Sequence, residues 1–301
     1  MKEFQILVKR NTKLFFKDKG LFFTSLITPL ILLVLYATFL SNVYKSSFES
    51  VINGMGLSID KDILNGLASG QLMSSLLAVS CVTVSFCSNM LMVQDKISGA
   101  YNDMLITPSK RSLRALAYYV STSLSTLLIC FIALGACLIY VGATGWYLTI
   151  GDVLLLVLDI FLLTMFGTAL SSIINHFLSS QGQISAVGSI VSSCYGFICG
   201  AYMPLASFSE GLRSVLMFLP GTYGTSLVRN HALRGVFDKM VESGLPQQAI
   251  DGIANSVDCN LEFFGSSVSQ GAMYAVVAVT VGILIGAYVL INVLSGRKKN
   301  K

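Results

Sequence analysis

Few side chains in this sequence could do chemistry, and Asp159 is the clearest of them. It is the one carboxylate well inside an apolar run, in the stretch VLLLVLDIFLLTMFG of residues 153–167. An unpaired carboxylate is costly to bury in apolar surroundings, so we expect it to face polar partners or water. Two roles stay open. The group is either a polar point on a transport path or proton relay, or a partner in a hydrogen bond to a neighbouring serine or tyrosine, with the acid kept neutral.

Motifs for catalysis and metal binding are absent from the sequence. It contains no G-x-x-x-x-G-K-[ST] phosphate loop, no H-E-x-x-H and no nucleophile elbow. His176 and His231 match no metal-ligand spacing, so we expect structural roles for both. Six of the seven cysteines lie in apolar runs, and Cys259 stands alone outside them, which indicates no disulfide framework. We therefore expect no catalytic residue, no metal site and no cofactor in this chain.

The elements that must position these side chains are membrane helices. The sequence is 54% hydrophobic and only 12% charged, about half the charged fraction of a soluble domain. Its apolar residues come in blocks of about 20, the length that crosses about 30 Å of hydrocarbon, and a backbone in lipid must be helical. We predict an all-α integral membrane protein with six transmembrane helices within residues 21–301. The spans are Leu21–Leu40, Leu72–Val93, Ala115–Val141, Val153–Ile174, Gln183–Met203 and Ala272–Leu294.

The distribution of lysine and arginine predicts the orientation of these spans. Six of these residues precede the first span, four follow the second and four end the chain. The loop after the first span and the long segment after the fifth hold two and four. Basic residues stay on the cytoplasmic side, so both termini are predicted to be cytoplasmic in a multi-pass protein of the cell membrane. Residues 2–19 contain no continuous apolar region, and we expect no cleavable signal peptide there.

Two regions outside the spans have a predicted shape. Residues 1–20 alternate apolar and basic residues at helical spacing, which predicts an amphipathic interfacial helix ended by Gly20. This helix is either a topology anchor or a mechanical element. Residues 204–235 are apolar but broken by Pro220, which favours a re-entrant or interfacial helical pair. Residues 236–270 are polar and acidic, and we expect a small extracellular cap.

The fifth predicted span carries a strip of small residues. Small side chains at every fourth position let two helices approach closely in lipid, where packing drives association. The partner of this strip is either in the same chain or in a second copy. The strip consists of Gly188, Ser192, Gly196 and Gly200.

The segment of residues 94–114, QDKISGAYNDMLITPSKRSLR, is short and charged and lies between the second and third spans. A glycine and a proline bound a short helix within it, which could pass a partner's rigid-body motion to both spans. Its basic tail, including Arg114, is expected to hold the membrane interface.

Two motifs in the sequence resemble the type-2 ABC transporter permeases. Residues 95–100, DKISGA, followed by 103–108, DMLITP, are similar to that family's cytoplasmic signature, although Gln94 stands where a glutamate often begins the pattern. Residues 218–223, FLPGTY, continuing to Arg229 and Gly235, look like the family's external passage before the last span. With the N-terminal helix and six spans, the resemblance covers nearly the whole chain.

The resemblance implies partners and roles. The permease pairs with an identical or related permease and with separate ABC ATPase subunits that bind ATP and Mg²⁺, in a membrane that we expect to be bacterial; no nucleic acid is involved. Residues 94–114 become a coupling segment braced by the N-terminal helix, and the re-entrant helices become an external gate. The expected coupling residues are Asp95, Lys96, Gly99, Asp103, Leu105, Thr107 and Pro108. The expected residues of the substrate path or gate are Asp159, Pro204, Pro220, Tyr223 and Arg229.

The favoured function is an ATP-driven exporter of an amphipathic or hydrophobic substrate, such as a drug, antibiotic peptide or lipid-like molecule. A lipid-linked glycan is an alternative substrate, which a wall of aromatic residues would favour; Trp146 is the only tryptophan, and twelve tyrosines keep this alternative open. An ion- or proton-coupled secondary carrier is a further alternative. Asp159 favours it, but no internal repeat is evident.

Overall fold

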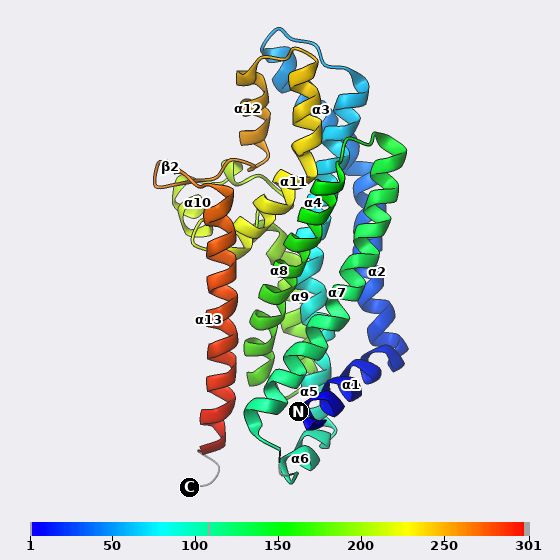
Figure 1. Cartoon of the computed structure of the whole chain (residues 1–301), viewed down its shortest axis with the longest axis vertical. Coiled ribbons are helices and arrows are strands. Elements are labelled where there is room, and N and C mark those ends of the chain that lie inside the picture. The colour runs from blue at the N-terminus through cyan, green and yellow to red at the C-terminus, as the bar shows by residue number, and fades with distance from the viewer. Residues whose placement is uncertain (1, 108, 298–301) are drawn as a thin grey trace.

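The computed structural model describes residues 2–107 and 109–297, with side chains as far as residue 294. Within these residues nearly all of the regular structure is helical, and the long helices stand side by side as an upright bundle (Figure 1). The two strands, β1 (Glu262–Phe263) and β2 (Ser266–Ser267), form one small antiparallel hairpin. The prediction of an all-α membrane protein is confirmed.

Five helical segments among the described residues are long and apolar enough to cross a membrane. The first runs without a break through a short π-helical turn, and the second bends only at Asn89. The segments are α2 (Lys19–Leu35) with η1 (Tyr36–Leu40) and α3 (Ser41–Gly54), α4 (Lys61–Ser88) with α5 (Met90–Ile97), α7 (Arg111–Thr144), α8 (Ile150–Phe177), and α13 (Gln270–Arg297).

The predicted fifth span forms α9 (Gln181–Ile198), which is not among these five segments. Its first turn carries two glutamines, and serines and glycines occupy much of the rest, so it falls short of the hydropathy that marks the five segments. α9 packs against α4 and α5, and most of its remaining surface is exposed.

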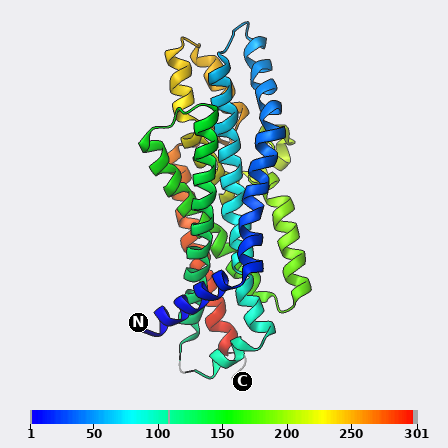
Figure 2. The ribbon, with the colours of Figure 1, turned by 90° about the vertical axis from the view of Figure 1, so that its right-hand side faces the viewer.

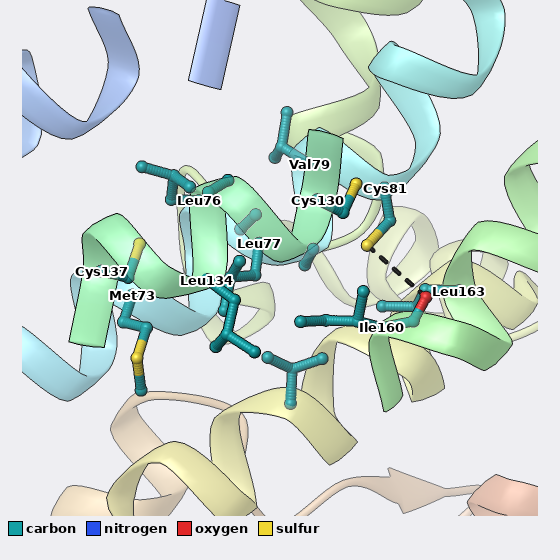
Figure 3. Packing of buried hydrophobic residues seen from close by; sticks show 14 of the residues in the cluster. Met73, Leu76, Leu77, Val79, Cys81, Cys130, Leu134, Cys137, Ile160 and Leu163 are labelled. Atoms are coloured by element: carbon teal, nitrogen blue, oxygen red, sulfur yellow. Dashed lines mark hydrogen bonds between the residues drawn. The ribbon is translucent and has the colours of Figure 1, made fainter. Parts of the chain in front are cut away.

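The helix α4 is the centre of the bundle. It is buried along nearly its whole length and packs against α2, α7, α8, α9 and α11. Small side chains allow this crowding, and Figure 3 shows Cys81 of α4 beside Cys130 of α7, with the Cys81 thiol directed at the Ile160 carbonyl at 3.9 Å. These cysteines serve as small apolar residues in the core, and all seven cysteines are free thiols.

The N-terminal helix α1 (Lys2–Lys17) crosses the bundle near the end where α13 finishes (Figure 2). It packs against α7 and α2, with Phe15 and Asn11 buried. Its predicted end at Gly20 is wrong. The helix stops at Lys17 because the Asp18 carboxylate accepts from the Leu21 amide at 3.0 Å and so caps the next helix, α2, which contains Gly20.

The opposite end of the molecule holds a second, smaller core. There α3 and the start of α4 pack with the second half of α11 (Pro220–Glu242) and with α12 (Gln247–Ser256). Two short helices, η2 (Leu205–Ser207) and α10 (Glu210–Leu216), precede α11. α11 is one continuous helix of 23 residues, so it runs through the predicted boundary between residues 235 and 236. Pro220 is its first residue, where a proline needs no amide donor.

Candidate functional site

The segment between α5 and α7 forms a turn and a short helix, α6 (Ala100–Leu105), at the N-terminal-helix end of the bundle (Figure 1). Gly99 makes the turn with a φ of +84°, in the left-handed region that favours glycine. No atom lies within 4 Å of the place where a side chain of Gly99 would begin, so backbone conformation alone demands glycine here. Of the predicted coupling residues, Pro108 lies outside the described residues.

The outer face of α6 is open to solvent. Asn102, Asp103 and Thr107 are exposed, Leu105 is half-buried, and Ile106 is 87% exposed. The Thr107 hydroxyl donates to the Met104 carbonyl at 2.7 Å and closes the end of the helix. A rigid surface with an acid beside an exposed isoleucine suits docking to another protein.

Asp95 is buried and does not belong to that surface. Its carboxylate pairs with both terminal nitrogens of the Arg10 guanidinium, at 2.6 and 3.0 Å, and accepts from the Tyr118 hydroxyl at 2.5 Å. The hydrogen bond to Asp95 raises the pKa of the Arg10 guanidinium above its ordinary value, so Arg10 stays protonated. Asp95 thereby joins α5 to α1 and α7.

Lys96, the residue after Asp95, contacts a different helix and caps the end of α8. Its ammonium donates to the carbonyl oxygens of Asn175, His176 and Leu178 at 3.0, 2.6 and 3.1 Å. The last carbonyls of a helix lack donors from a following turn, although the Asn175 carbonyl also accepts from the Leu178 amide at 3.3 Å, and a cation at a helix C-terminus is electrostatically favourable. Lys96 therefore ties α5 to α8 rather than facing a partner protein.

Arg114 holds α6 against the start of α7, and its burial does not fit the interfacial role predicted for the basic tail, whereas Lys110 is exposed and Arg111 is half-buried. The side chain is buried, and one terminal nitrogen donates to the Met104 carbonyl at 2.8 Å and to the Ser109 carbonyl and hydroxyl at 3.0 and 2.9 Å. The short helix is thus fixed at both ends, by Gly99 and by Arg114.

This fixed element lies in the middle of a region matched by a known family. A family model described as ABC-2 type transporter matches residues 2–232, from α1 into α11. The chain belongs to the ABC-2 type transporter family. No curated protein and no solved structure matches the chain. As an ABC-2 permease, the protein is a membrane transport subunit, and its family implies a lipid membrane and an ABC ATPase partner.

Arg229, predicted for the permease's gate, is fully buried. Its guanidinium donates to the Val257 carbonyl at 2.5 Å and the Gly200 carbonyl at 2.9 Å, and lies 3.4 Å from the Asp258 carboxylate. That carboxylate also accepts from the Leu205 amide at 2.8 Å. Burial raises the pKa of the Asp258 carboxyl, an effect that the nearby Arg229 charge opposes. The cluster fastens α11 to the end of α9 and to the segment after α12.

The other predicted gate residues shape the connection between α9 and α11. The Tyr223 hydroxyl donates to the Met217 carbonyl at 2.7 Å, and the Thr222 hydroxyl donates to the Leu216 carbonyl at 2.9 Å. Both bonds satisfy carbonyls at the end of α10. Pro220 begins α11, and Pro204 precedes η2. Together these contacts fold the connection back on α11 and fix its sharp turn.

Asp159 lies in a buried polar cluster that joins three helices of the permease. One carboxylate oxygen is 2.6 Å from Nδ1 of His231 on α11, and the other accepts from the Tyr274 hydroxyl of α13 at 2.6 Å. The His231 and Tyr274 rings stack with centroids 6.2 Å apart. A tyrosine partner for Asp159 was expected, but His231 was expected to have a separate structural role, because 72 residues separate it from Asp159.

The small-residue strip of α9 does not form one contact surface within the chain. A side chain at Gly196 would collide with the ring of Tyr202, which folds back over it. Gly200 ends the helix with a φ of +74°. Gly188 lies near Met90, and Ser192 is exposed. Each of the four positions therefore has its own environment.

An apolar pocket of about 250 Å³ opens between α4, α8 and α9, beneath the turn that begins α11. Phe86, Leu170, Val191 and Tyr195 form much of its wall, and Leu219 closes one end. Every residue lining it in the described part of the chain is uncharged. The pocket can receive apolar groups but offers no charged side chain to a polar ligand.

Proposed function

We propose that this ABC-2 permease is the membrane subunit of an ATP-driven exporter. It moves an amphipathic or hydrophobic substrate, such as a drug, antibiotic peptide or lipid-like molecule, out of the cell. ATP and Mg²⁺ are bound by separate ATPase subunits that dock on the exposed face of α6. The observation that carries this proposal is the attachment of α6, through α5, to three transmembrane or interfacial helices at once.

The contacts of α5 and α6 with neighbouring helices provide a path for transmitting force. A push on Asp103 and Ile106 moves α6, which Gly99 and Arg114 hold rigidly between α5 and α7. Lys96 transmits the displacement to the end of α8, and Asp95 transmits it to α1 and α7. Packed helices change position as rigid bodies, so a shift of this one element can change how α8 and α7 pack around α4.

The chemistry of the pocket supports the substrate class. Its uncharged wall favours apolar groups, whose transfer from water is worth about 25 cal/mol per Å². Trp146, half-exposed at the connection between α7 and α8, does not line this pocket, whose aromatic residues are Phe86 and Tyr195 among mostly aliphatic neighbours. A hydrophobic or amphipathic substrate therefore suits the site better than a lipid-linked glycan.

The exposed face of α9 supports pairing with a second permease, identical or related. Ser189, Ile190, Ser193 and Phe197 are all exposed, although Ile190 also borders the pocket and the Phe197 ring packs against Tyr202. Small residues on a lipid-facing helix let another helix approach closely. Because α9 also forms one wall of the pocket, such a pairing would place the pocket beside the interface between two permeases.

The polar cluster around Asp159 gives less support to a secondary carrier. Both carboxylate oxygens have partners, one on α11 and one on α13, as expected for a group that fixes helix positions. The structural role of Asp159 is therefore the one we favour over a proton relay.

Co-purification and coupled transport assays test the proposal. An ATPase subunit should co-purify with the permease. The charge reversal Asp103→Lys should leave basal ATP hydrolysis unchanged but abolish substrate-stimulated hydrolysis and export. Glu3→Lys, which reverses an exposed acid on α1, is the matched control and should leave export unchanged. Normal export by the Asp103→Lys complex would contradict the coupling assignment.

A further inference from the structure

A second pocket of about 250 Å³ lies at the external end of the permease, between α10 and the β1–β2 hairpin. Glu210, Arg213 and Met217 contribute from the α10 side, and Glu262 and Phe263 contribute from the hairpin. This pocket is separate from the apolar one between α4, α8 and α9, and it combines charged groups with aromatic rings. Neither the coupling segment nor the Asp159 cluster uses it.

The hairpin stands at the level of the membrane surface. β2 ends at Ser267, and α13 begins at Gln270 with a candidate membrane span of 25 residues, Gln270–Leu294. Figure 1 shows the hairpin and α10 beside the upper end of α13. A segment so close to the start of a span must lie among the lipid headgroups.

Large apolar side chains around this pocket face outward. Phe264 is 78% exposed, Phe218 is 63% exposed and Val215 is 60% exposed. The three phenylalanines pack edge to face, with ring centroids 5.2 Å apart for Phe218 and Phe263 and 4.7 Å apart for Phe263 and Phe264. Such a cluster is unfavourable in water but suits the boundary between headgroups and acyl chains, where aromatic and aliphatic residues of interfacial elements insert.

The tip of the hairpin is built to display an aromatic ring. Phe264 and Gly265 are both left-handed, with φ of +47° and +77°, as in a two-residue turn that normally takes Asn-Gly. A phenylalanine in the first position is disfavoured by its backbone. The local turn preference therefore does not account for Phe264, whereas contact with lipid does.

The charges in the pocket match a zwitterion. The half-buried Arg213 and the exposed Glu210 line the pocket from α10, and the exposed Glu262 lines it from the hairpin. Within the described residues, no ion pair of 4.0 Å or less joins Arg213 to either carboxylate. A guanidinium binds a phosphate in a bidentate manner, and a carboxylate accepts N–H bonds from a primary ammonium. A trimethylated ammonium has no N–H group to donate.

We propose that this pocket binds the headgroup of a phosphatidylethanolamine in the outer leaflet. Arg213 holds the phosphate, Glu210 and Glu262 hold the ammonium group, and the acyl chains lie against Phe218 and Phe264. The bound lipid fastens the hairpin and α10 to the membrane surface beside the first turn of α13. This inference goes beyond export and does not depend on the identity of the exported substrate.

Lipid retention by the full permease tests the site. The complex is reconstituted in nanodiscs of equal parts phosphatidylethanolamine, phosphatidylcholine and phosphatidylglycerol, released, and analysed by native mass spectrometry. The wild type should retain phosphatidylethanolamine in preference to the other two lipids. Arg213→Gln should reduce that retention about tenfold, the factor that loss of one charge-assisted hydrogen bond produces.

Two further variants separate the parts of the site. The double variant Glu210→Gln/Glu262→Gln should keep phospholipid but lose the preference for ethanolamine over choline. Phe264→Ser should weaken retention of all three lipids, and it also serves as the test if Arg213→Gln does not fold. The control Lys239→Gln, which removes an exposed charge on α11 away from the pocket, should behave as the wild type. Equal retention of the three lipids by the wild type, or a preference for phosphatidylglycerol, would overturn the proposal.

Discussion

The ammonium of Lys96 lies 2.6 Å from the carbonyl oxygen of His176, although 80 residues separate the two in the sequence. This contact connects α5, the helix before α6, to the C-terminal end of α8. The same α8 carries Asp159 nearer its other end, where that residue contacts α11 and α13. A displacement of α6 thus has a route of direct contacts toward the half of the permease that holds α11 and the start of α13.

Lys96→Met should separate ATP hydrolysis from export. The substitution keeps the length of the side chain but removes the cap on three carbonyls, at a cost of about 1–3 kcal/mol in stability. We expect basal ATP hydrolysis to persist while export in proteoliposomes falls about tenfold or more. Lys110→Met, at an exposed position in the same segment, is the control and should export normally. Unchanged export by Lys96→Met would show that the contact between Lys96 and α8 does not transmit the displacement of α6.

Removal of Arg10 should loosen the N-terminal helix. Arg10→Met leaves the buried Asp95 carboxylate with only the Tyr118 hydroxyl, and because Arg10 is partly exposed we expect a loss of about 1–3 kcal/mol. The double variant Arg10→Met/Asp95→Asn should recover part of that loss, because no uncompensated charge remains. Thermal unfolding of the purified complex, analysed as a double-mutant cycle, measures the coupling. Strictly additive effects would mean that the pair contributes nothing.

Gly99→Ala should strain the turn before α6. The left-handed conformation costs a residue with a side chain about 1–2 kcal/mol, and the surroundings leave room for the added methyl group. We expect reduced substrate-stimulated ATP hydrolysis with little change in expression. Gly99→Asn should do less harm, because asparagine adopts this conformation more readily. If alanine and asparagine behave alike, the conformation of Gly99 is not what coupling requires.

Asp159→Asn distinguishes a structural group from a proton carrier. An amide can keep one hydrogen bond of the cluster, so we expect a lower melting temperature, a loss of about 1–3 kcal/mol, and reduced but measurable export. The dependence of export on pH should stay that of the wild type. Complete loss of transport together with its pH dependence would instead favour the secondary carrier.

The cluster formed by Arg229 and Asp258 should contribute less to stability as the pH rises. Burial raises the folded-state pKa of this carboxyl above its ordinary value, so the closed segment binds a proton more tightly than the open one. Its contribution to stability is therefore full at low pH and is lost as pH rises through the folded pKa. Hydrogen exchange of residues 257–261, corrected for intrinsic rates, should show easier opening at about pH 7 than at about pH 4. Asp258→Asn should flatten this dependence, and a wild-type trend in the opposite direction would refute it.

Sequence alone was sufficient for the class of protein and for most of its helices. The length and hydropathy of an apolar block are local properties. The first four predicted spans and the sixth therefore coincide with the five long apolar helical segments. The turn at Gly99 was equally predictable, because a glycine there interrupts the helical pattern before a short charged helix. The apolar and basic alternation of residues 1–20 likewise predicted α1, with an error of three residues at its end.

Tertiary structure alone decided what the charged and polar side chains do. Asp95 and Lys96 stand next to each other in the sequence, but one contacts α1 and α7 whereas the other contacts α8. Asp159 meets His231 and Tyr274 from two other helices, 72 and 115 residues away. A buried polar group must find its partners wherever the packing of helices brings them, and that packing depends on many contacts distant in sequence. Local patterns therefore fixed which segments enter the membrane, and the packed bundle fixed which side chains face one another.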